Sequence, residues 1–206
     1  MLEGDFIMFD RLIHLYARGG EPFRSLSDLP DEEALALMRS LYRAGAVYWD
    51  RFADPAAYLQ SRRTVENWLR QEFIAQGGKP QVQAPIYMVL GRTAWMRTAV
   101  NALTLATTGE IKVPLSLFTA ADISFTYPDS MVSAMLAYHQ DPRYYLPEFH
   151  GKLFTLPAIL AILAERGLPG ETWGNNLPDG WANYIEAQVW NRAVLLEWRQ
   201  QCNANQ

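Results

Sequence analysis

The chain has 206 residues and a formal net charge of −4, and half of its residues are hydrophobic. This composition predicts a folded domain with its own core rather than a disordered chain. The negative charge argues against general nucleic-acid binding, because such binding depends on Lys and Arg side chains that neutralise phosphates. Cys202 is the only cysteine, so neither an intrachain disulfide nor a thiolate zinc cluster is expected.

The first ten residues are acidic and lack the basic segment and long apolar run of a secretory signal. No apolar stretch is long enough to cross a bilayer; the most apolar one, residues 153–163, contains Pro157. Together with the single cysteine, which fits a reducing compartment, these features predict a cytoplasmic protein that does not associate with membranes.

The first third of the chain predicts three helices. Residues 6–17 carry apolar side chains at spacings of three and four, and Gly19 and Gly20 follow. A second helix is expected from Asp31 towards Gly45, and a third from 55 to 78, where Asp54 precedes Pro55. Three arginines give this third helix a basic edge, which is typical of a solvated face: Arg62, Arg63 and Arg70.

The remainder alternates between strands and helices. Strands are predicted at 85–91, 111–118, 123–127 and 184–190. Helices are predicted at 93–106, 131–138, 155–167 and 194–200, with a loop at 168–180. We therefore predict one α+β domain over residues 1–206, in which a helical N-terminal part (1–78) precedes a mixed or split β-sheet with interspersed helices (79–206).

Glu186 is the most informative carboxylate, because it interrupts a sheet-like run of residues. Alternation along the strand places Ile185, Ala187 and Val189 on one face. The other face carries Glu186 and Gln188 between two aromatic residues, Tyr184 and Trp190. If the aliphatic face packs on the core, the carboxylate faces a cleft, where it can stabilise a cationic transition state. The alternative is a solvated or ion-paired glutamate on a surface strand.

The 123–127 strand carries hydroxyl groups on one face, at Ser124 and Thr126, and runs into Asp129 and Ser130. Hydroxyls beside a cleft can orient a sugar or the neighbouring strand. A turn in which the Asp129 side chain bonds to nearby backbone explains the acidic end of this segment equally well.

The order of these segments resembles that of ADP-ribosyltransferase-like proteins. A strand closed by glycine is followed by a helix, a strand that ends in F-T-Y-P-D-S (125–130), and a late Y-I-E-A-Q-V-W strand (184–190). The resemblance implies a split-sheet fold that holds NAD in a cleft. It also implies that a glutamate holds the nicotinamide ribose while the glycosidic bond breaks.

Carried over by position, the resemblance makes Glu186 the catalytic residue and Ser124 and Thr126 the polar residues of the middle strand. Tyr87 or Gly91 then belongs to the nicotinamide wall, and the E-x-Q pattern adds Gln188 to the NAD site.

Two features depart from the family pattern. The first strand has no His or Arg before Gly91, and Tyr184 stands two residues before the glutamate, where many members have Gln or Glu. Arg92 is then the residue expected to pair with the NAD diphosphate, because a guanidinium matches phosphate oxygens well.

The leading hypothesis is a metal-independent, NAD-dependent ADP-ribosyltransferase-like enzyme with an unknown acceptor; the three histidines lack the spacing of metal ligands. One alternative is a non-enzymatic α+β module that binds a protein partner through its Trp and Tyr residues and the 168–180 loop; the chain has seven Trp and ten Tyr. Another is a glycosidase-type hydrolase that uses Glu186 and Asp129 as a carboxylate pair, roughly 5 to 10 Å apart.

Overall fold

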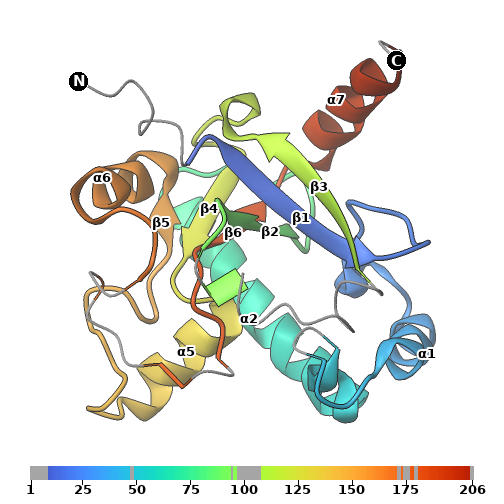
Figure 1. The fold of residues 1–206 in the computed structure, drawn as a ribbon, viewed down its shortest axis with the longest axis horizontal. Helices are drawn as coiled ribbons and strands as arrows, with labels where there is room; N and C mark the ends of the chain where they lie inside the picture. The colour runs from blue at the N-terminus through green and yellow to red at the C-terminus, as the bar shows by residue number, and fades with distance from the viewer. Residues whose placement is uncertain are drawn as a thin grey trace.

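The computed structural model describes residues 9–46, 49–93, 95–96, 108–170, 173, 177–178 and 181–204. Within these ranges six strands form one sheet in the order β3-β1-β2-β6-β4-β5 (Figure 1). The strands are β1 (Arg11–Ala17), β2 (Ile86–Leu90), β3 (Thr108–Pro114), β4 (Ile123–Thr126), β5 (Phe154–Thr155) and β6 (Glu186–Val189). Every neighbouring pair is antiparallel, so the sheet is not mixed. The described strands also form one continuous sheet and not a split one, so the prediction of a mixed or split sheet is wrong.

Helices flank this sheet, which confirms the α+β class. They are α1 (Asp31–Leu41), α2 (Pro55–Ala75), α5 (Ser130–His139), α6 (Leu156–Arg166) and α7 (Arg192–Ala204). Short 3₁₀ turns lie at η1 (Leu26–Asp28), η2 (Asp50–Ala53) and η3 (Leu115–Leu117). In Figure 1 the long helix α2 runs beside α5 below the sheet, while the C-terminal end of α7 extends away from the sheet.

Side-chain caps fix where two of the helices begin. Asp54 accepts a hydrogen bond from the Ala57 N–H (3.1 Å) at the start of α2, as Asp129 does from the Val132 N–H (2.8 Å) at the start of α5. These caps account for the agreement between the predicted and observed starts. The predicted strands are also confirmed, except that the end of the 111–118 segment forms η3 instead.

The predicted helix at 6–17 is wrong, because residues 11–17 form β1 and pair with both β2 and β3. Leu12 packs into the main core, whereas Ile13 packs on the opposite face of the sheet. A strand buried on both faces reads as a continuous apolar run, and such a short run fits a helical spacing equally well. The expected helical N-terminal part (1–78) therefore contributes a strand to the sheet before α1 and α2.

The two faces of the sheet have different characters. One face is aliphatic and packs against α6 and α7; the rows Ile86–Val189–Ile123 and Met88–Ala187–Phe125 cross it in register. The opposite face carries two polar rows, Tyr87–Gln188–Ser124 and Val89–Glu186–Thr126. The polar face is covered by α2, whose Phe73 stacks on Trp190 with ring centroids 5.5 Å apart. Glu186 therefore projects from the sheet away from the main core.

The predicted helix at 93–106 and the predicted loop at 168–180 lie largely outside the described residues. No helix in the described part of the chain is both long and apolar enough to cross a bilayer.

Candidate functional site

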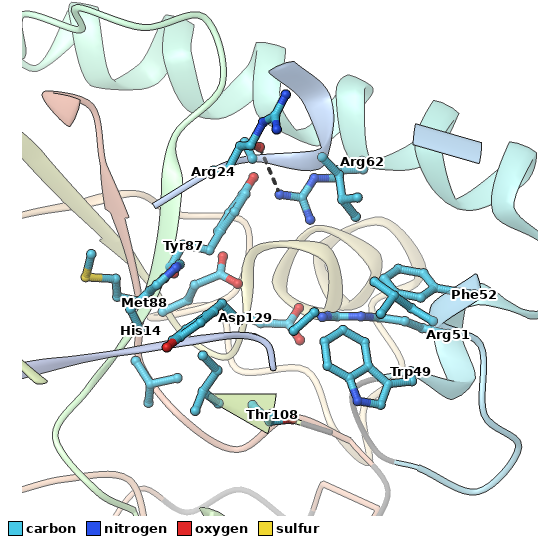
Figure 2. A pocket seen from close by; sticks show the side chains of 18 of the residues that line it. His14, Arg24, Trp49, Arg51, Phe52, Arg62, Tyr87, Met88, Thr108 and Asp129 are labelled. Atoms are coloured by element: carbon cyan, nitrogen blue, oxygen red, sulfur yellow. Dashed lines mark hydrogen bonds between the residues drawn. The ribbon is translucent and has the colours of Figure 1, made fainter. Parts of the chain in front are cut away.

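A cavity of about 650 Å³ opens on the polar face of the sheet. Its walls come from β1, β2 and β6, from the 20–29 segment, and from α1, η2, α2 and the start of α5 (Figure 2). Both Glu186 and Tyr87 line it. A volume of this size is typical of small-molecule sites. The Glu186 strand therefore faces a hollow and not an open surface.

The pairing of β4 with β6 sets the position of Glu186. Thr126, at the end of β4, lies opposite Glu186, so the α5 helix that follows begins directly beside the carboxylate. The Ser130 N–H donates to Glu186 Oε1 (3.0 Å), and the Gln188 side-chain amide donates to the same oxygen (3.1 Å). The helix N-terminus and the amide thus orient the carboxylate of Glu186, a residue that is 8% exposed.

The pKa of Glu186 is raised to about 7. The main cause is burial, which disfavours the charged form, and the second is the like charge of Asp129. The hydrogen bonds from Ser130 and Gln188 oppose this rise. A carboxyl group with such a pKa changes its charge near neutral pH, which is typical of functional sites.

A fully buried network supports Glu186 from behind. The Gln188 amide nitrogen also donates to Thr126 Oγ1 (3.0 Å), and its oxygen accepts from Ser124 Oγ (3.0 Å). Ser124 Oγ in turn accepts from the Trp190 indole N–H (2.9 Å). Ser124, Thr126 and Gln188 are completely inaccessible and do not line the cavity. Their geometry suits the orientation of Glu186 and not direct contact with a ligand.

Tyr87 connects the cavity to α2. Its hydroxyl donates to Glu66 Oε1 (3.2 Å), and the Arg62 guanidinium lies 4.5 Å from the centre of its ring. Arg62 Nε donates to the same Glu66 oxygen (2.9 Å). The Glu66 side chain is only 4% exposed and that of Arg62 12%, so this is a buried ion pair.

The prediction of a solvated basic edge is therefore wrong for Arg62, because its side chain is largely buried. Its side chain lines the cavity and also contacts the hydroxyl groups of Ser25, Ser27 and Tyr58. Its neighbour Arg63 does fit the expectation, because it pairs with the exposed Asp31 (2.7 Å).

The structure does not bring Gly91 and Arg92 to Glu186. Gly91 follows β2 with a positive φ of 65°, and its N–H donates to the Arg11 carbonyl. The Arg92 guanidinium is bound by Glu110 at 2.6 Å, and neither Gly91 nor Arg92 lines the cavity. Three other arginines line it instead: Arg24, Arg51 and Arg62.

His14 forms part of the cavity wall but already has partners for both ring nitrogens. Nδ1 lies 3.1 Å from the Tyr87 carbonyl, to which it donates, and Nε2 accepts from the Phe23 N–H (2.9 Å). Burial lowers its pKa to about 4, so the ring is neutral at physiological pH. His14 thus ties the 20–29 segment to the sheet and shapes the cavity.

No family model matches the sequence, and the searches of curated proteins and of solved structures find no match. No group of three or more His, Cys, Asp or Glu side chains in the described ranges is arranged to hold a metal ion.

The sequence interpretation missed the arginines and His14 for three reasons. His14 lies in the segment that was predicted as a helix (6–17), Arg24 and Arg51 lie between the predicted helices, and Arg62 lies on a helix face that reads as solvated. One signal was present: Arg62 and Glu66 are four residues apart on a helix, which places them on the same face.

Proposed function

We propose that the protein transfers the ADP-ribosyl group of NAD to an acceptor, with Glu186 as the catalytic carboxylate. The observation that supports this most strongly is the setting of Glu186. It is a buried carboxylate, oriented by two donors on one oxygen, at the wall of a cavity large enough for a small molecule.

In this mechanism the bond between the ribose C1′ and the nicotinamide nitrogen breaks, and the electron pair leaves with nicotinamide. Positive charge develops on the ribosyl ring, and the Glu186 carboxylate stabilises it. An ionic interaction of this kind is stronger in a site largely closed to water, where the carboxylate is already oriented before the reaction. The second role of the Glu186 carboxylate is to bind a ribose hydroxyl.

Aromatic and basic side chains of the same cavity suit the rest of NAD. The rings of Tyr16, Tyr87 and Tyr184 line it and offer faces for a flat heterocycle. Arg24, whose side chain is 48% exposed, lies at the cavity and pairs only loosely with Glu21 at 3.7 Å. It replaces Arg92 as the expected partner of the diphosphate.

The decisive experiment is to incubate the purified protein with NAD and to measure released nicotinamide by chromatography. We expect Glu186→Gln to slow the release by roughly 10²- to 10³-fold, because it removes the charge that stabilises the transition state. The matched control is Glu110→Gln, which alters an ion pair outside the cavity and should leave the rate unchanged. Equal rates for the wild type and Glu186→Gln would refute the role of Glu186.

One observation favours a second candidate, a glycosidase-type hydrolase. Asp129 lines the same cavity as Glu186, and its charge contributes to the raised pKa of Glu186. Such enzymes usually use two carboxyl groups that flank the glycosidic bond to be cleaved. Release of reducing sugar from aryl glycosides without turnover of NAD would support this candidate over the transferase.

A further inference from the structure

Asp129 and Glu186 are held by the same helix terminus. Asp129 caps α5 by accepting from the Val132 N–H, while the next residue, Ser130, gives its N–H to Glu186. Asp129 lies three residues after the end of β4, and Glu186 is the first residue of β6, which pairs directly with β4. Both line the cavity. The arrangement therefore presents two carboxyl groups, and not one, to any bound molecule.

The two carboxyl groups have different electrostatic surroundings. Arg51, from η2, points towards Asp129 in Figure 2, and its guanidinium lies 5.5 Å from the Phe52 ring centre and 5.7 Å from that of Tyr58. Removal from solvent raises the pKa of Asp129, whereas the Val132 N–H and the Arg51 charge oppose this rise.

No cation contributes comparably to the pKa of Glu186. The other charged or titratable side chains that line the cavity with the two acids are His14, Tyr16, Glu21, Arg24, Arg51, Tyr58, Arg62, Tyr87 and Tyr184. The Arg51 charge thus favours the ionised form of Asp129, which is the form that can accept a proton.

We infer that Asp129 is the base that accepts the proton of the incoming nucleophile, and that the acceptor is therefore a hydroxyl, an amine or water rather than a carboxylate. This inference rests on the proposed function. The C1′–nicotinamide bond breaks and its electron pair leaves with nicotinamide. A bond forms between C1′ and the acceptor atom, whose proton passes to the Asp129 carboxylate and then to solvent.

A nucleophile without a proton provides the test. Azide attacks C1′ as an anion and needs no base, whereas water must lose a proton. We expect Asp129→Asn to slow nicotinamide release in water by roughly 10²-fold or more, the usual contribution of a positioned base. Added azide should restore release by this variant to near the wild-type rate, with formation of the ribosyl azide. Asparagine caps helices about as well as aspartate, so α5 should remain intact.

Two controls separate a base from a structural role. Asp54→Asn makes the same change at the cap of α2, and Asp54 does not line the cavity, so its rates with water and azide should match the wild type. We expect Glu186→Gln to slow nicotinamide release both in water and with added azide, because both reactions pass through the same cationic transition state.

Two results for Asp129→Asn would overturn the inference: wild-type rates in water, or slow release that azide does not restore. A wild-type protein that releases no nicotinamide with either water or azide would overturn the proposed function itself.

Discussion

Replacing Glu66 with Gln is expected to destabilise the protein by about 3 kcal/mol, since removal of one member of a buried ion pair leaves the other charge uncompensated. Arg62 donates to Glu66 at 2.9 Å, and both side chains are largely inaccessible. The Tyr87 hydroxyl would then donate to a neutral amide oxygen instead of a carboxylate, which weakens its hydrogen bond as well. Urea unfolding monitored by fluorescence measures the change.

The matched control for this prediction is Glu72→Gln, on the exposed side of the same helix, which should change stability by less than about 0.5 kcal/mol. A Glu66 variant as stable as this control would show that the ion pair does not support the cavity wall.

Replacing Glu186 with Gln should have the opposite effect and stabilise the protein at alkaline pH. The pKa of Glu186 in the folded state, about 7, lies above its unfolded value. Its contribution to stability is therefore complete below about pH 4.5 and is lost as the pH rises through about 7, because the buried group must then ionise. Glutamine avoids this cost, which amounts to as much as about 3 kcal/mol at pH 8.

Unfolding in urea at about pH 8 and about pH 5 measures this effect. The variant should be more stable than the wild type at the higher pH only, while Glu110→Gln should show no such difference. A Glu186→Gln protein that is less stable at the higher pH would instead indicate a structural, ion-paired glutamate. A gain in stability on loss of a site residue is typical of functional positions, where activity requires a destabilised group.

The sequence predicted those parts of the fold that local chemistry determines. Asp54 and Pro55 mark the start of α2 because a cap and a proline act within one turn. The alternation around Glu186 correctly assigned its strand faces, because the aliphatic residues of β6 all pack in the core. The prediction for residues 11–17 was wrong because a strand buried on both faces has no alternation of apolar and polar side chains.

The cavity could not be predicted from the sequence, because it is built from segments far apart in the chain. Arg51 precedes α2, Tyr87 lies on β2 and Asp129 caps α5, and only the pairing of the strands brings them together. The hydroxyls of Ser124 and Thr126 illustrate the same limit. Their face of the strand was predicted, but their full burial behind Gln188 depends on the packing of Trp190 and α2.

The dependence of nicotinamide release on pH tests the central claim most directly, because the mechanism requires ionised Glu186. With a pKa of about 7, the wild-type rate should reach a plateau above about pH 8 and fall about tenfold per pH unit well below pH 7. The residual rate of Glu186→Gln should lack this inflection. A wild-type rate that is flat between about pH 6 and about pH 9, or the same inflection in Glu186→Gln, would contradict the assignment of Glu186.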